Sequence, residues 1–140
     1  MKSIHRTAAL ATAALAVGIA TASAQSQVSM SVSVPFAFTA GGQVMPAGDY
    51  RIPLNAGRTV LIADQGNRHT QWINSAVPTE TKADYKPRVV FSCRGEHCTL
   101  REVHPGYTTT GYQLPVKRSK SDSQELAKVV VLSATLTHAD

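Results

Sequence analysis

The sequence predicts an all-β fold, a small antiparallel β-sandwich or barrel with one short C-terminal helix before the last strand. Three observations carry this prediction. Several short segments alternate apolar and polar residues, Gly and Pro turn signals separate them, and only one segment has the chemistry of a helix start. A period of two buries one face of a strand and leaves the other in water, as in an antiparallel sheet.

The first predicted strand begins at Val28, and its alternation continues through Phe38. Pro35 lies on the polar side of this strand, where its missing N–H predicts an edge or a bend. Turns are predicted at 40–42 (Ala-Gly-Gly) and 46–48 (Pro-Ala-Gly). A second alternating strand follows the latter turn.

The middle of the chain predicts one hairpin and then a loop. Strands at 59–63 and 68–74 are joined by the turn Asp-Gln-Gly-Asn at 64–67. The segment 75–86 contains Pro78 and several charges, so it is predicted to be a loop.

The C-terminal half predicts more strands and the single helix. Strands at 88–93 and 98–103 surround a Gly-containing loop, and a weak strand covers 111–114. Residues 121–128 start with the Ser-x-x-Gln spacing of a capping box and predict about two helical turns. The β-branched apolar run at 129–136 is typical of a strand that is covered on both faces.

The N-terminus predicts export. A basic segment, an apolar run and the small residues Ala-Ser-Ala form a signal peptide over residues 1–24, with cleavage between Ala24 and Gln25. The remaining 140 − 24 = 116 residues suit a single β domain over residues 25–140. We therefore expect a periplasmic or secreted protein with no membrane span after signal cleavage.

The charge of the predicted mature chain is mild. Lys2 and Arg6 leave with the signal, so 12 basic and 9 acidic residues remain, a net charge of 12 − 9 = +3. Apart from one short basic cluster at 117–120, the basic residues are scattered. Nucleic-acid binding needs a basic face with a recognisable module, and we expect none here.

Cys93 and Cys98 are the only cysteines, and they have three interpretations. As partners across a hairpin with the four-residue loop 94–97 they would lie close enough for a disulfide, which an oxidising compartment favours. A metal site with His97 and His104 fits the usual zinc spacing poorly. Redox chemistry would need Cys-x-x-Cys at a helix start. The disulfide is the prediction, and no metal or cofactor is expected.

Catalytic motifs are absent from the sequence: it has no Gly-x-Ser-x-Gly, no His-Glu-x-x-His, no phosphate loop and no dinucleotide fingerprint. Four separate histidines are predicted to be surface or turn residues, namely His69, His97, His104 and His138. A triad assembled only by the fold stays open. The aromatic residues are assigned to the core rather than to a ligand pocket, namely Phe36, Phe38, Tyr50, Trp72 and Phe91.

Three motifs carry a family resemblance: Val-Pro-Phe-Ala-Phe at 34–38, Pro-Ala-Gly-Asp-Tyr-Arg-Ile at 46–52, and Gly-Tyr-Gln-Leu-Pro at 111–115 before the predicted helix. Together they resemble short exported proteins of uncharacterised function of the Acidobacteria type. The resemblance covers most of the mature chain and implies its fold and location, but no activity. Where this pattern has polar or aromatic residues beside the Gly turn, this chain has Cys93 and Cys98, which favours a local staple.

For function, the sequence predicts a noncatalytic exported envelope protein that acts as a binding or interaction module. The alternatives are a small apolar-ligand carrier with a barrel cavity and a small hydrolase with dispersed residues. A carrier needs an enclosed apolar cavity. An interaction module needs an apolar patch or an unprotected strand edge. An enzyme needs a histidine near a nucleophile or a carboxylate. The expected partner is an unknown envelope protein or a small apolar ligand. The sequence identifies neither this partner nor the oligomeric state.

Overall fold

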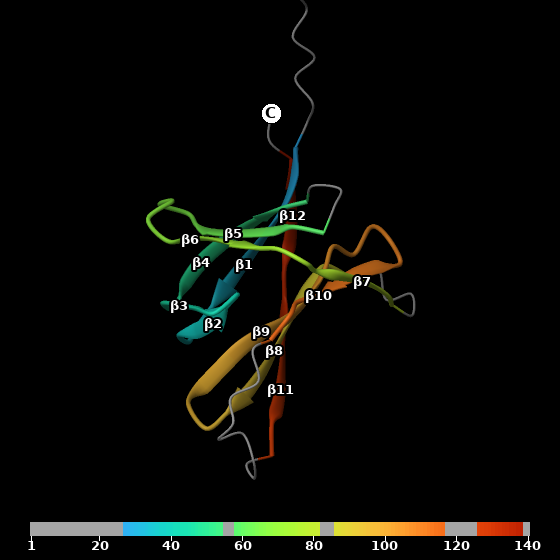
Figure 1. The fold of residues 1–140 in the computed structure, drawn as a ribbon. Helices are drawn as coiled ribbons and strands as arrows, with labels where there is room; N and C mark the ends of the chain where they lie inside the picture. Colours follow the sequence, from blue (N-terminus) through green and yellow to red (C-terminus); the bar gives the residue numbers. More distant parts are fainter. Residues whose placement is uncertain (1–26, 55–57, 82–85, 117–125, 139–140) are drawn as a thin grey trace, which may run out of the picture.

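The computed structural model describes residues 27–54, 58–81, 86–116 and 126–138, which form twelve β-strands in two sheets (Figure 1). None of these residues is helical. The predicted all-β class is therefore confirmed. The two sheets do not close into a barrel, so the barrel alternative is wrong.

One sheet has five antiparallel strands in the order β12-β1-β4-β5-β6. Its strands are β1 (Val28–Val34), β4 (Gly48–Pro53), β5 (Val60–Asp64), β6 (Thr70–Ile73) and β12 (Thr135–His138). The predicted strands at 59–63 and 68–74 lie here, within two residues of their expected ends. The first alternating segment was expected to continue through Phe38, but β1 ends at Val34.

The other sheet has seven strands, five of them in the order β11-β8-β9-β10-β7. Its strands are β2 (Phe38–Ala40), β3 (Gln43–Met45), β7 (Val77–Glu80), β8 (Arg88–Arg94), β9 (His97–His104), β10 (Thr110–Gln113) and β11 (Lys128–Ser133). The β2–β3 hairpin attaches through β2, which runs parallel to β9, so this sheet is mixed rather than purely antiparallel.

Prolines mark the points where the chain leaves one sheet for the other. β1 ends at Val34 because Pro35 has no N–H for the ladder, and the uninterrupted alternation then delivers Phe38 to the other sheet. The predicted bend at Pro35 is confirmed. Pro46 marks the return, and the buried phenol of Tyr50 donates a hydrogen bond to its carbonyl oxygen. Burial, and then the charge of Asp64, raise the pKa of Tyr50 above its ordinary value.

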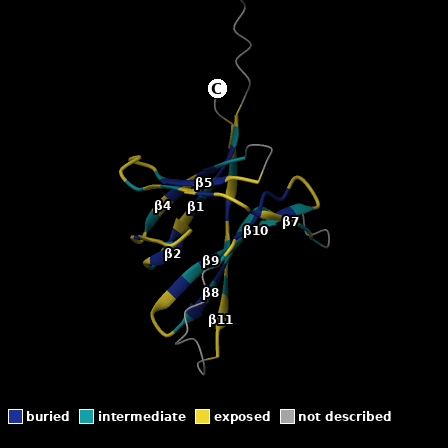
Figure 2. Cartoon of the chain, viewed as in Figure 1, coloured by how far each residue is buried: buried dark blue, intermediate teal, exposed yellow. Residues whose placement is uncertain are grey.

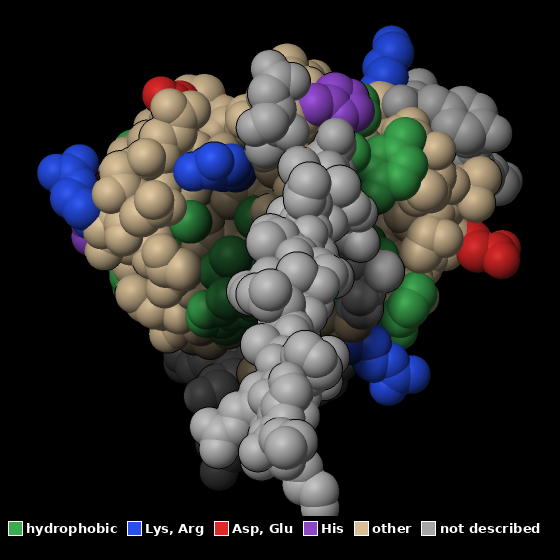
Figure 3. Space-filling view, turned by 90° about the horizontal axis from the view of Figure 1, so that it is seen from above, with side chains coloured by type: hydrophobic (Ala, Val, Ile, Leu, Met, Phe, Trp, Pro, Cys, Tyr) green, Lys and Arg blue, Asp and Glu red, His purple; other side chains and the backbone are tan. Residues whose placement is uncertain are grey.

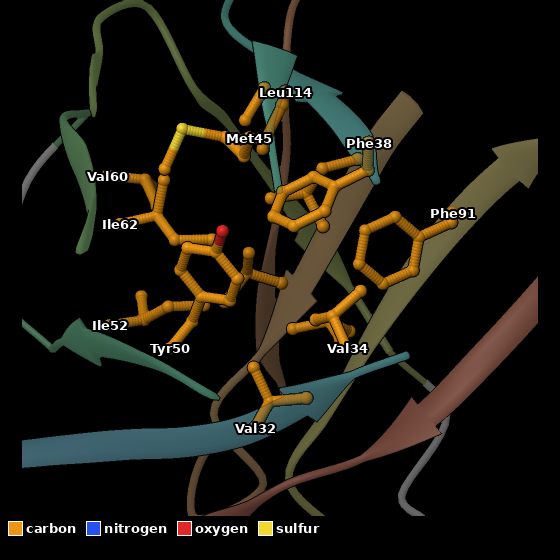
Figure 4. Packing of buried hydrophobic residues seen from close by; sticks show 14 of the residues in the cluster. Val32, Val34, Phe38, Met45, Tyr50, Ile52, Val60, Ile62, Phe91 and Leu114 are labelled. Carbon is orange, nitrogen blue, oxygen red and sulfur yellow. The ribbon is translucent and has the colours of Figure 1, made fainter. Parts of the chain in front are cut away.

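A single core lies between the two sheets (Figures 2 and 4). Phe38 meets the ring of Tyr50 from the opposite sheet edge to face, with centroids 5.1 Å apart. Phe91 meets Phe38 and Phe36 in the same way, each at 5.2 Å. Quadrupole interactions favour such T-shaped pairs. The five-stranded sheet adds Met30, Val32, Val34 and Ile52 to this core, and the seven-stranded sheet adds Met45, Leu100 and Val103.

Two predicted elements differ from the structure. Val77–Glu80 lies within the predicted loop but forms β7, because β7 is an edge strand that tolerates Pro78 in its ladder. The predicted helix at 121–128 is not seen: Leu126 and Ala127 are not helical, and Lys128 already starts β11. Residues 121–125 lie outside the described residues.

The predicted signal peptide, including Ala24 and Gln25, also lies outside the described residues. In the part of the chain that the structure describes, there is no helix long and apolar enough to cross a membrane.

Candidate functional site

The C-terminal apolar run is the segment that departs most from its prediction. Residues 129–136 were expected to be covered on both faces, and this is wrong: Val129 and Val131 are 65% and 54% exposed. β11 is the last strand of the seven-stranded sheet, and Figure 2 shows it as largely exposed. Only one side of the strand packs inward, where Val130 and Leu132 contact the core.

The same segment borders both sheets. β11 pairs with β8 and β12 pairs with β1, and among the described strands nothing pairs with the other edge of either. The chain passes from one sheet to the other at Ala134, whose buried N–H donates to the carbonyl oxygen of Pro87 at 2.9 Å. In Figure 1 the two strands form one nearly straight segment along the molecule.

Beyond Lys128, at the start of β11, this border lacks the features that normally protect a strand edge. Natural edges carry Lys, Pro or a bulge that prevents pairing with another chain. Residues 129–137 contain no charged residue, no Pro and no Gly, and they are rich in β-branched side chains. An exposed strand of this composition pairs readily with another strand. We call the free side of Lys128–Ser133 the β11 edge.

Next to the β11 edge lies the cysteine hairpin. Cys93 and Cys98 are directly opposite each other, and their sulfur atoms are 2.03 Å apart, at disulfide distance. Phe91 likewise lies opposite Leu100 in this hairpin. The loop is shorter than the four residues expected, because Arg94 and His97 extend the ladder and leave only Gly95 and Glu96 in the turn. Among the described residues, no group of three or more His, Cys, Asp or Glu side chains could hold a metal ion.

Replacing both cysteines with alanine is expected to lower the free energy of unfolding by about 2 kcal/mol, because the crosslink closes only a short loop in the unfolded chain. Urea denaturation of the variant and the wild type measures this difference. Wild-type protein kept in reductant should match the variant. An unchanged denaturation midpoint would contradict the crosslink. Loss of the fold would contradict the expected size of its contribution.

His104 is the histidine whose predicted location is wrong. It was predicted to be a surface or turn residue, yet it is 5% exposed and both ring nitrogens have partners. Nε2 lies 2.8 Å from a carboxylate oxygen of Glu102, and Nδ1 lies 3.3 Å from the hydroxyl of Thr81. Gly111 leaves room for the imidazole, because a Cβ there would lie 2.2 Å from Nδ1.

This hydroxyl–imidazole–carboxylate order resembles a hydrolase triad, but its surroundings favour a structural role. The Thr81 hydroxyl also donates to the carbonyl oxygen of Thr109 at 3.1 Å, which ties it to the backbone. Neither of the two depressions described on the surface is lined by Thr81, Glu102 or His104. The network satisfies the buried, polar imidazole of His104.

Asp64 is the acidic group with the most altered titration in the described chain. Its burial raises the pKa, but three hydrogen bonds outweigh that effect and lower the pKa below its ordinary value. They come from the backbone N–H of His69 at 3.3 Å, its imidazole at 3.3 Å and the backbone N–H of Arg68 at 2.7 Å. The carboxylate therefore closes the β5–β6 turn and is a weak base.

The interior offers little room for an apolar ligand. Rings and aliphatic side chains from both sheets fill the space where a carrier would hold its cargo (Figure 4). The two described depressions are open to solvent, with volumes of about 390 and 500 Å³. Of the aromatic residues assigned to the core, Trp72 is the exception: it is 56% exposed and lines the smaller depression.

These features define a class of protein: an all-β chain of two sheets over one core, with a cysteine-clasped hairpin and an unprotected apolar edge. No known family model, curated protein or solved structure matches this chain.

Proposed function

We propose that this chain is a noncatalytic exported protein of the cell envelope, with a β-sandwich fold, that acts as an interaction module through the β11 edge. The observation that carries the proposal is the strand β11 at the border of the seven-stranded sheet, with exposed valines and no charged residue after Lys128. Such an edge gains main-chain hydrogen bonds and covers apolar side chains when another strand is added to it. The occupant we propose is the same edge of a second copy.

Self-complementarity supports a second copy as the partner. Antiparallel pairing about a two-fold axis at Val130 sets Val129 of one chain opposite Val131 of the other, twice. These two valines are the exposed large hydrophobic side chains of β11, and the pairing covers both of them. Lys128 then lies opposite Leu132, and the two lysines do not face each other.

Charge-swap variants test this arrangement. Val129→Lys with Val131→Lys places lysine opposite lysine and should abolish the dimer, whereas Val129→Lys with Val131→Glu restores opposite charges at both positions. Sedimentation equilibrium of the exported protein at low ionic strength measures the dissociation constants. We expect a dimer for the wild type, a monomer for the Lys–Lys variant and a dimer again for the Lys–Glu variant.

Val44→Lys is the matched control, because Val44 is also an exposed valine of a strand but lies away from β11. It should leave the dimer intact. A monomeric wild type at all concentrations would refute self-pairing, and so would a dimer that survives the Lys–Lys substitution.

Two further observations agree with export. A cysteine pair at disulfide distance is compatible with an extracytoplasmic location, where such bonds persist. The motifs that resemble exported Acidobacteria-type proteins fall on core strands and on the points where the chain changes sheet, so that resemblance is kept as part of the proposal. Mass spectrometry of the protein recovered from its host envelope tests cleavage after Ala24, and an uncleaved chain would contradict export.

A further inference from the structure

The smaller depression is a cleft between the two sheets. β6 contributes Trp72 and, just beyond the strand, Asn74, while the opposite sheet contributes Thr39 and Thr99. The turn between β2 and β3 completes the wall with Gly41 and Gly42, both at positive φ. Its volume of about 390 Å³ is within the range of small-molecule sites.

The two glycines of the β2–β3 turn add no side chain to this wall of the cleft. A side chain at 42 would project into open space, since no atom lies within 4 Å of its Cβ position. At 41 a Cβ would press against the side chains of Gln71 and Ile73, both at 3.0 Å. The turn therefore packs closely against β6 on one side and leaves the cleft open on the other.

The lining specifies the chemistry of a ligand. None of the nine described residues that line the cleft is charged, so this described lining offers no counter-ion to a phosphate, a carboxylate or an amine. On the face seen from above, Figure 3 shows charged side chains set apart from one another. Hydroxyl groups of Thr39 and Thr99 can donate and accept hydrogen bonds. The Asn74 carbonyl oxygen accepts from Thr59 at 3.3 Å, and that bond does not use its NH₂ donors.

Trp72 is not explained by packing. It is the only tryptophan of the chain, and its indole is 56% exposed although β6 buries its neighbour Ile73. The side-chain amide of Gln71 donates to the carbonyl oxygen of Trp72 at 3.2 Å, which helps to fix this part of the edge strand. An exposed indole beside uncharged hydrogen-bonding groups suits a ligand with one apolar face and many hydroxyl groups.

We propose that the Trp72 cleft binds a neutral saccharide. The C–H face of a pyranose ring packs on the electron-rich face of the indole, and its hydroxyl groups pair with Thr39, Thr99 and Asn74. A fatty acid is disfavoured because the cleft is open and partly polar. A nucleotide is disfavoured because no Lys or Arg is among the described residues that line the cleft. This site is separate from the β11 edge, so the two proposals succeed or fail independently.

Intrinsic fluorescence tests the proposal, since the single tryptophan reports directly on the cleft. We would titrate the exported protein with cellobiose, maltose and diacetylchitobiose, and with glucose 6-phosphate, adenosine and decanoate as comparison probes. At least one neutral disaccharide should give a saturable change at millimolar concentration. Calorimetry should show about tenfold weaker binding for Trp72→Ala, and unchanged binding for Tyr107→Ala, whose ring is equally exposed (54%) but does not line the cleft.

The dependence of affinity on the chain length of the saccharide distinguishes a polymeric glycan from a free sugar. Tighter binding of cellopentaose than of cellobiose identifies an envelope or cell-wall glycan, and equal binding identifies a free sugar. The proposal is overturned if no neutral saccharide binds at tens of millimolar, if Trp72→Ala binds as the wild type does, or if a comparison probe binds more tightly than every saccharide.

Discussion

Replacing Phe38 with alanine is expected to lower the free energy of unfolding by about 3–5 kcal/mol, the largest effect of any substitution considered. Phe38 is fully buried and touches Tyr50 of the opposite sheet as well as Phe91 of its own. Its removal takes away a ring that contacts both sheets and leaves a cavity in the core between them. A domain of this size has only about 5–15 kcal/mol of stability, so the variant should be close to unfolded.

Urea denaturation followed by circular dichroism measures this loss. Phe38→Leu keeps most of the volume and should recover more than half of the lost stability. Trp72→Ala is the matched aromatic control, since its indole is largely exposed, and it should change stability by less than about 0.5 kcal/mol. Equal costs for Phe38→Ala and Trp72→Ala would show that the aromatic cluster does not hold the sheets together.

Replacing Gly111 with alanine is expected to cost about 1–3 kcal/mol or more, because the new methyl group would overlap the imidazole of His104. The nearest atom, Nδ1, is 2.2 Å from the Cβ position. Moving the ring would also break its hydrogen bonds with Thr81 and Glu102. The free energy of unfolding of the variant, from urea titration, gives the cost.

A double-mutant cycle separates this overlap from any general effect of the glycine. His104→Ala removes the ring, so in that background Gly111→Ala should cost almost nothing, which gives a coupling energy of about 1–3 kcal/mol. Gly48→Ala is the control, since nothing lies within 4 Å of its Cβ position. If Gly111→Ala costs the same with and without His104, the ring is not what requires glycine there.

Local patterns predicted most of the strands. The alternation from Val28 onward predicted the buried faces of β1 and β2, since side chains on a pleated strand point alternately to the two sides. The opposition of Cys93 and Cys98 was predictable for the same reason, because a hairpin fixes which residues face each other across a few positions. Pro35 predicted the bend because a missing N–H acts within its own strand.

Features that depend on neighbours distant in sequence could not be predicted. The apolar run at 129–136 has the pattern of a buried strand, but it became an edge because, among the described strands, β11 pairs only with β8 and β12 pairs only with β1. His104 and Thr81 are 23 residues apart and meet only when β7, β10 and β9 assemble. From the sequence, Gly111 indicates only a weak point in a strand. The structure shows that the imidazole of His104 occupies the space where a Cβ at 111 would lie.

The sequence by itself determined the all-β class, the positions of most turns, the cysteine clasp and the composition of the core. Each of these follows from periodicity and turn chemistry within about ten residues of chain. Only the tertiary structure decided which strand became an unprotected edge, which aromatic residue stayed outside the core and which glycine makes room for a ring. Those outcomes depend on strand order, and strand order is set by the global burial of apolar surface between two sheets rather than by any local pattern.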